Sequence, residues 1–179
     1  MSNRSATLLI LTGRSMNPIT KSQFTLGLDC IQKLRHSRDH LPQTTAENDM
    51  LRLLADGGAA VEALQRAIEP ETFCGARDRE SAVSESMAAI HDAAASVQRD
   101  RVRRSLYEVT IELDGFLARI DLLRVHADRI ELVELKSKNL PDQGFLGRSG
   151  KIRSEWLSYI QDLAFQHELL RRWVAIHAE

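Results

Sequence analysis

The chain has 179 residues, of which 43% are hydrophobic and 27% charged, and this is the composition of a globular domain with a core of its own. A formal net charge of −1 excludes the strongly basic class of nucleic-acid-binding proteins, although a local basic surface remains compatible with it. The two cysteines, Cys30 and Cys74, exclude a disulfide framework and do not have the spacing of metal ligands.

Residues 1–18 are expected to form an N-terminal tail that precedes the folded domain. The apolar segment at 6–11, ATLLIL, is too short to cross a membrane and lacks the flanks of a cleavable signal. No segment indicates export, so the sequence predicts a cytoplasmic protein without a membrane partner.

Two helices are expected in the first seventy residues. Thr20 followed by Gln23 forms a capping box, which predicts one helix that runs from Thr20 to a basic end near Arg38. Residues 46–68 predict a second helix, and Gly57-Gly58 is expected to interrupt it.

After a third expected helix at 81–99, residues 106–138 read as three consecutive β-strands, a meander. The two-residue period of the first strand predicts one apolar face, formed by Tyr107, Val109, Ile111 and Leu113. Asp114-Gly115 is a strong hairpin signal between the first and second strands. The third strand, 130–136, carries apolar residues on both faces, so we expect it to be central and covered on both sides.

Acidic residues and a lysine gather on the second and third of these strands. Asp121 lies on the apolar second strand, while Glu134 and Lys136 lie near the end of the third. Two carboxylates on adjacent strands suit Mg²⁺, and the lysine could orient an attacking water or offset charge that develops on a phosphate. The alternative is that Glu134 and Lys136 form an ordinary solvated pair at the sheet edge.

The rest of the chain adds a loop and a final helix. Residues 137–151 predict a glycine-rich loop whose cations could attract a phosphate backbone, namely Lys138, Arg148 and Lys151. A plain flexible connector explains the same composition. Residues 154–173 predict an amphipathic helix with Gln166 in its apolar stripe, where it bonds either the site or a backbone group. Residues 173–177 predict the start of a fourth strand.

Four sequence blocks occur in the order found in one known superfamily. They are Thr20–Phe24 with Gly27–Cys30, Glu108–Asp121, Val133–Ser137 and Asp162–Gln166. Asp121 followed by Glu134-Leu135-Lys136 resembles the D…(D/E)xK signature of the PD-(D/E)XK nuclease superfamily, in its RecB-type branch. Together the four blocks are most similar to an uncharacterised bacterial group with a nuclease-like domain.

This resemblance implies a fold and a set of roles. The fold would be α/β (α+β) and restriction-endonuclease-like, with helices that flank a small mixed sheet built on the meander, over residues 19–179 and incomplete at the C-terminal end. The ligands of Mg²⁺ or Mn²⁺ would be Asp121, Glu134 and the carbonyl of Leu135. The catalytic residues would be Asp121, Glu134, Lys136 and Gln166, with Glu108 in support. An iron–sulfur cluster is not expected, because the late cysteines that hold it in some relatives are absent.

The function implied by the resemblance is metal-dependent hydrolysis of DNA phosphodiester bonds. The alternative is a catalytically degenerate module that binds nucleic acid or a protein partner without cleavage. Two departures favour this alternative: Gly58 or Ala59 stands where RecB-type relatives carry a histidine on the second helix, and the chain ends early. A short, exposed sheet edge would also allow a protein partner or a homo-oligomer.

Overall fold

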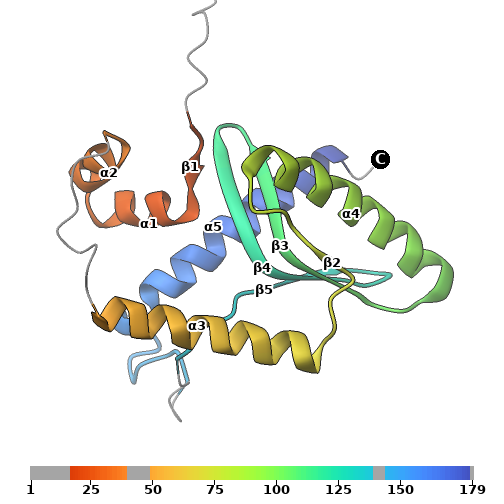
Figure 1. Cartoon of the computed structure of the whole chain (residues 1–179). Coiled ribbons are helices and arrows are strands. Elements are labelled where there is room, and N and C mark those ends of the chain that lie inside the picture. The colour runs from red at the N-terminus through yellow and green to blue at the C-terminus, as the bar shows by residue number, and fades with distance from the viewer. Residues whose placement is uncertain (1–16, 40–48, 139–143, 178–179) are drawn as a thin grey trace, which may run out of the picture.

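The computed structural model describes residues 17–39, 49–138 and 144–177 (Figure 1). Its elements are, in chain order, β1 (Ile19–Thr20), α1 (Lys21–Asp29), α2 (Ile31–Arg38), α3 (Asp49–Ile68), β2 (Phe73–Cys74), α4 (Arg79–Asp100), β3 (Arg104–Leu113), β4 (Phe116–Val125), β5 (Ile130–Val133) and α5 (Ser154–His177). The predicted tail lies almost wholly outside the described residues. Within them, no helix is both long enough and apolar enough to cross a membrane.

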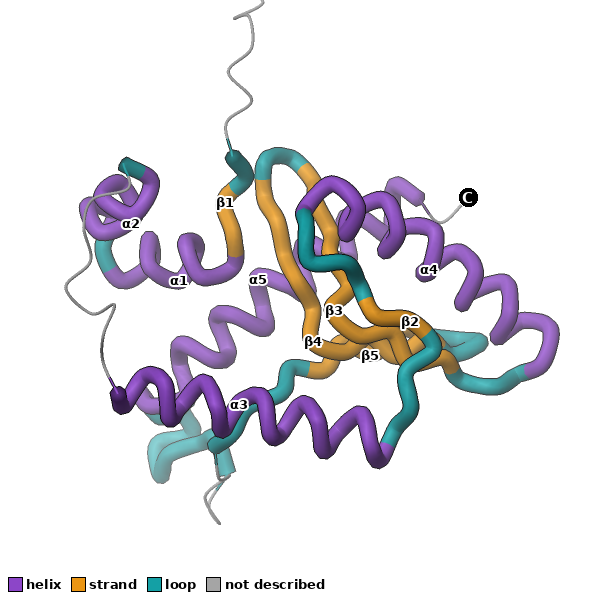
Figure 2. The backbone as a smooth tube through the Cα atoms, in the orientation of Figure 1, coloured by secondary structure: helices purple, strands orange, loops and turns teal. Residues whose placement is uncertain are grey.

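The five strands of the described residues form one mixed sheet, and the tube view shows them grouped between the helices (Figure 2). Strands β3, β4 and β5 are the antiparallel meander expected from the sequence. One edge of β4 pairs with β3, while its other edge pairs with β1 near Phe116 and with β5 from Leu122 onwards. The protein is therefore a mixed α/β structure in which β4 is the central strand.

The third strand of the meander differs from the prediction. It was expected to be central and to extend to residue 136, but β5 ends at Val133 and pairs, among the described strands, only with β4. All four of its residues are half-buried rather than enclosed. Apolar residues on both faces of a short strand indicate contact on both faces, and this pattern alone does not separate a central strand from a covered edge strand.

The hairpin between β3 and β4 turns where the sequence predicts. Asp114 and Gly115 both have left-handed backbones, with φ of 51° and 77°. Positive φ at both central positions gives a two-residue turn whose twist matches that of the flanking strands. The amide of Ile19 in β1 donates to the carbonyl of Gly115 at 2.8 Å, so the start of the described chain is attached at this turn.

The ladder between β3 and β4 has a gap in its middle. Tyr107 pairs with Leu122 and Val109 pairs with Ile120, but the residues between them, Glu108 and Asp121, are not paired. Glu108 has a left-handed backbone with φ of 53°, which a residue with a side chain adopts at a cost of about 1 kcal/mol or more. At the gap, Glu108 and Asp121 therefore do not follow the regular pairing of the two strands.

The gap also inverts the side-chain alternation. Leu106 shares the core cluster with Val109 although the two are three residues apart. Tyr107 instead faces the end of α3, and its hydroxyl donates to the carbonyl of Glu69, the residue after that helix, at 2.8 Å. The prediction that Tyr107 and Val109 share one face is thus wrong, because the left-handed residue between them reverses the two-residue period.

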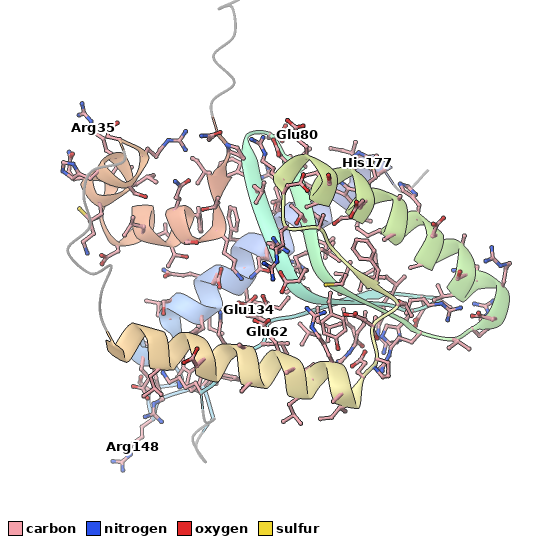
Figure 3. The ribbon with its side chains drawn as sticks, in the orientation of Figure 1. Arg35, Glu62, Glu80, Glu134, Arg148 and His177 are labelled. Carbon is pink, nitrogen blue, oxygen red and sulfur yellow. The ribbon has the colours of Figure 1, made fainter. Side chains whose placement is uncertain are left out.

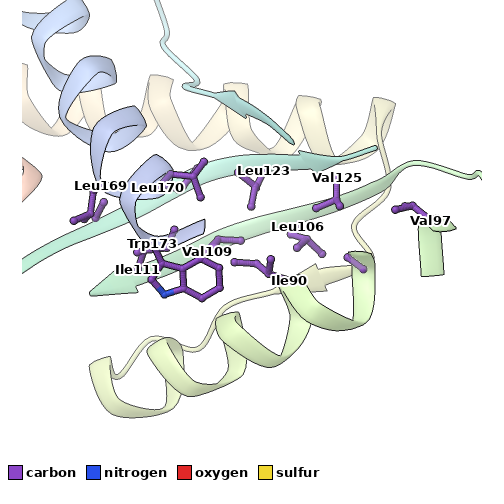
Figure 4. Close-up of a cluster of buried hydrophobic side chains, with 13 residues drawn as sticks. Ile90, Val97, Leu106, Val109, Ile111, Leu123, Val125, Leu169, Leu170 and Trp173 are labelled. Carbon is purple, nitrogen blue, oxygen red and sulfur yellow. The ribbon is translucent and has the colours of Figure 1, made fainter. Parts of the chain in front are cut away.

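Helices α4 and α5 supply the other half of the core (Figure 4). The cluster comprises Ile90, Ala93, Val97, Leu106, Val109, Ile111, Ala118, Ile120, Leu123, Val125, Leu169, Leu170 and Trp173. Trp173 was predicted to begin a fourth strand, but it continues α5 to His177. Its indole is buried beside Leu169 and Leu170, and this helical spacing of apolar contacts explains the longer helix.

Two of the predicted helix boundaries also change. The capping box of Thr20 and Gln23 is confirmed, but the expected single helix breaks at Cys30, whose extended backbone separates α1 from α2. Conversely, α3 runs through Gly57-Gly58 without the predicted interruption. Glycine lowers helix stability by about 1 kcal/mol per residue, which the rest of a 20-residue helix can absorb.

Candidate functional site

The two predicted carboxylates meet where β5 ends beside β4. Asp121 lies at the ladder gap in β4, and Glu134 follows the last residue of β5. The amide of Leu135 donates to Oδ2 of Asp121 at 2.9 Å. This bond ties the segment after β5 to the middle of β4, so the two acids predicted from the sequence lie in one place.

Glu134 is the centre of this cluster, and Figure 3 places it between the strands and α3. Its side chain is only 7% exposed. Gln166 from α5 is fully buried and donates from Nε2 to Oε2 of Glu134 at 2.7 Å. The ammonium of Lys136 is hydrogen-bonded to Oε1 of Glu134. Three of the four predicted catalytic side chains are thus in direct contact, and the Glu134–Lys136 pair is not a fully solvated edge pair.

Two further charged residues belong to the cluster and were not predicted. Lys21, the first residue of α1, places its ammonium 3.0 Å from Glu134, 3.9 Å from Asp121 and 3.7 Å from Asp162. Asp162 from α5 also lies 3.6 Å from the ammonium of Lys136. The signal for Asp162 was its position four residues before Gln166, which puts both on one face of α5. The only sequence signal for Lys21 is that it belongs to the first of the four sequence blocks, Thr20–Phe24.

The close approach of three carboxylates changes their proton affinities. Burial, together with the neighbouring carboxylate of Glu134, raises the pKa of Asp121 from 3.8 to about 6. Burial and Glu134 also raise the pKa of Asp162. Burial acts to raise the pKa of Glu134 as well, but hydrogen bonds from Lys136 and Gln166 outweigh it and hold that pKa below its ordinary value. Glu134 is therefore the most firmly ionised member of the cluster.

The donor atoms of the cluster suit a hard cation. Oδ1 of Asp162 and Oε1 of Gln166 are buried acceptor atoms that have no hydrogen-bond partner in the described part of the chain. Among the described residues, no three His, Cys, Asp or Glu side chains are arranged around one metal position. Mg²⁺ is commonly bound through one or two carboxylates and keeps several waters, so the pair of Asp121 and Glu134 fits it by chemistry.

Glu108 was predicted to support the site, but its described contacts lie elsewhere. Its carboxylate is hydrogen-bonded to Arg119 and lies 3.8 Å from Arg66. Its carbonyl oxygen lies against Gly75, where an added Cβ would come within 2.2 Å of it. The left-handed backbone of Glu108 thus directs its side chain to two arginines rather than into the carboxylate cluster.

The three loop cations occupy different environments. Lys138 donates to the carbonyl of Glu155 at 3.2 Å, and its ammonium lies 4.4 Å from the ring centre of Trp156 and 5.0 Å from that of Tyr159. Tyr159 also lies 5.8 Å from the ammonium of Lys136, so Lys138 adjoins the cluster. Arg148 projects away from the ribbon in Figure 3, and it is exposed, as is Lys151.

A second basic surface was not predicted. A pocket of about 390 Å³ is lined by arginines from the start of α4 and from β4, together with Thr20 and Gln23 at the start of α1. The arginines are Arg77, Arg79 and Arg119. Thr20, which lines this pocket, immediately precedes Lys21 in the chain.

The position predicted for a histidine, Gly58 or Ala59, makes no contact with the cluster. A Cβ added to Gly58 would meet nothing within 4 Å, and Ala59 is exposed. A Cβ added to the preceding residue, Gly57, would lie 3.6 Å from the hydroxyl oxygen of Ser137, the residue after Lys136. Helix α3 thus passes beside the segment that carries Glu134 and Lys136. Among the described side chains of α3, none is a histidine.

Comparison of the chain with protein-family models, with curated proteins and with solved structures finds no match.

Proposed function

We propose that the protein is a metal-dependent nuclease of the PD-(D/E)XK type, RecB-like, that hydrolyses phosphodiester bonds of DNA. The observation that carries the proposal is the convergence of Asp121, Glu134 and Lys136, with Gln166 bonded to Glu134 at 2.7 Å. The first three belong to the meander, whereas Gln166 comes from α5. A purely structural pair of charges would not require a second, half-buried carboxylate and a fully buried glutamine beside it.

The metal site in this proposal consists of Asp121, Glu134 and the main-chain carbonyl of Leu135. Mg²⁺ or Mn²⁺, when bound, would polarise a phosphate oxygen and lower the pKa of a bound water. The chain's own residues do the rest. Gln166 orients the Glu134 carboxylate, and the amide of Leu135 orients that of Asp121.

Lys136 is the proposed catalytic cation. Burial acts to lower its pKa, but its hydrogen bond to Glu134 outweighs this and raises it, so the ammonium stays protonated at neutral pH. Hydrolysis forms a bond from water to phosphorus and breaks a bond from phosphorus to a sugar oxygen, which leaves with a proton. A fixed ammonium beside the carboxylates offsets the negative charge that develops on the phosphate oxygens during this step.

Basic residues around the cluster support a nucleic-acid substrate. Lys138 adjoins the cluster next to Tyr159. Arg77 lines the pocket at the start of α1, in which Arg79 is paired with Glu112 and Arg119 with Glu108. Arginine and lysine contacts with phosphates provide affinity that does not depend on sequence. We place the protein in the cytoplasm, where DNA is its substrate.

The second candidate is a module that binds nucleic acid or a protein partner without cleavage. It is favoured by the absence of a histidine at Gly58 or Ala59 of α3, because the resemblance implies that a histidine there would add a ligand to the metal site. The edge of β5 is the surface on which a protein partner or a second copy would pair. The two candidates differ in whether they require a divalent metal.

Thermal melting with and without Mn²⁺ tests the proposed function. A specific ligand at about a hundred times its Kd stabilises the native state by about 2.7 kcal/mol, which corresponds to a rise in Tm of about 5–10 °C for a domain of this size. We expect this rise in the wild type and its loss in Asp121→Ala. Cleavage of single- and double-stranded DNA should require the metal and should be abolished in Asp121→Ala and in Lys136→Ala.

Two results would change the proposed assignment. Cleavage that survives both substitutions would refute the assignment of the site. Binding of DNA without a metal-dependent rise in Tm and without cleavage would establish the non-cleaving module instead.

A further inference from the structure

We propose that Lys21 is a built-in counter-cation of the carboxylate cluster, and that a divalent metal binds only in competition with its ammonium. This inference rests on the proposed function, because it takes Asp121 and Glu134 as the metal ligands. It assigns Lys21 a role in setting metal affinity. Lys21 is thus a positioning residue rather than a catalytic one.

The geometry places the ammonium of Lys21 where a bound cation would be most strongly attracted. It lies within 4 Å of carboxylate oxygens of Asp121, Glu134 and Asp162, which come from β4, from the segment after β5 and from α5. Its two contacts with Glu134 are 3.0 and 3.2 Å. Its side chain is 23% exposed, so water screens these contacts only in part.

The position of Lys21 at the start of α1 is itself unusual. A cation in the first turn of a helix is unfavourable, because the helix dipole places partial positive charge there. The first turn of α1 contains no acidic residue that would offset it. The three carboxylates are therefore what stabilises the ammonium at this place. The capping box of Thr20 and Gln23 fixes the backbone from which Lys21 extends.

The net charge of the cluster determines how strongly it attracts a divalent metal ion. Three carboxylates and the ammonium groups of Lys21 and Lys136 sum to −1. Removal of the charge of Lys21 makes the sum −2 and also clears the space between the carboxylates. A divalent cation then competes for Glu134 with one ammonium group, that of Lys136, instead of two. We expect the affinity for Mn²⁺ to rise by a factor of about ten or more when Lys21 loses its charge.

Isothermal titration calorimetry with Mn²⁺ tests this inference directly, because it measures binding rather than cleavage. The variants are Lys21→Met, the charge-preserving Lys21→Arg and Lys33→Met as a matched control. Lys33 is an exposed lysine that pairs with Asp29 four residues earlier, away from the cluster. Circular dichroism checks the fold of each variant. Should Lys21→Met fail to fold, Lys21→Gln keeps a hydrogen-bond donor for Glu134 while it removes the charge.

The inference predicts a Kd for Mn²⁺ at least about tenfold lower in Lys21→Met than in the wild type. Lys21→Arg and Lys33→Met should stay within about threefold of the wild type. If the wild type binds Mn²⁺ and Lys21→Met binds it no more tightly, the inference fails while the proposed function stands. Tight binding by Lys21→Met in a protein that never cleaves DNA would support the inference and refute the nuclease. No binding by any variant overturns both.

Discussion

In the absence of a metal, ionisation of the Asp121 carboxylate lowers the stability of the folded protein at neutral pH. Its pKa is raised to about 6 by burial and by Glu134, against an ordinary value of 3.8. Because the folded-state pKa lies above the unfolded-state value, ionisation favours the unfolded state. The penalty is absent below about pH 4, grows between pH 4 and pH 6, and is complete above pH 6. The difference of the two pKa values corresponds to about 3 kcal/mol.

Asp121→Asn removes this penalty while it keeps an acceptor for the amide of Leu135. We therefore expect the variant to be more stable than the wild type by about 2–3 kcal/mol at pH 7.5 in the presence of a chelator. The advantage should shrink to about 1 kcal/mol at pH 4.5. Urea unfolding of both proteins at the two pH values measures the difference. Asp92→Asn, on the exposed face of α4, is the control and should change little at either pH.

The reasoning is refuted if Asp121→Asn is less stable than the wild type at pH 7.5, or if the difference between them is the same at both pH values. The first result would mean that attraction to Lys21 outweighs burial and the repulsion from Glu134. The second would mean that the effect of the substitution is one of packing. Addition of Mn²⁺ should reverse the order of stability, because only the wild type retains the full set of ligands proposed above.

Three further predictions concern the fold and the basic surfaces. Gly75→Ala should destabilise the protein by about 1–3 kcal/mol in thermal melting, because the new Cβ would meet the carbonyl of Glu108. Gly58→Ala, in the middle of α3, should stabilise the protein, because its Cβ meets nothing within 4 Å and alanine favours a helix more than glycine does. Glu69→Ala should cost about 3 kcal/mol in urea unfolding, since it leaves the guanidinium of Arg124 without its bidentate partner. The loop cations Lys138, Arg148 and Lys151 are tested by single replacement with Ala. If the replaced cation contacts a phosphate, the slope of log K for DNA binding against log salt concentration should decrease in magnitude by about one.

Local features of the fold were predictable from the sequence because their causes are local. The capping box needs only Thr20 and Gln23, and the hairpin needs only Asp114-Gly115 between two apolar strands. The break at Cys30 was not predictable, because no glycine or proline marks it. The length of α5 was also missed, because the run after Trp173 suits a strand as well as a helix, and only packing against the core decides between them.

The site was predictable to the extent that its motif lies in neighbouring strands. Asp121, Glu134 and Lys136 belong to one meander, so their proximity follows from strand pairing. Lys21 and Asp162 lie about 100 residues before Asp121 and about 40 after it, and only the packing of α1 against α5 brings them together. Two aromatic rings at this contact, Phe24 and Phe165, stack with centres 4.5 Å apart. A contact of this kind leaves no periodic signal in the sequence.

The ladder gap at Asp121 links the fold to the proposed chemistry. If the alternation of β4 continued unbroken from Ala118 and Ile120, Leu122 would join the core cluster and Leu123 would face away from it. The reverse is found, since Leu123 is in the cluster and Leu122 is buried on the other side. Asp121 and Leu122 thus both point away from the core, and Asp121 reaches the amide of Leu135. The left-handed Glu108 opposite it stores the strain that this arrangement costs. A regular ladder would hold the same acid at a lower cost in strain, but it would lack the irregularity that directs the carboxylate to the end of β5.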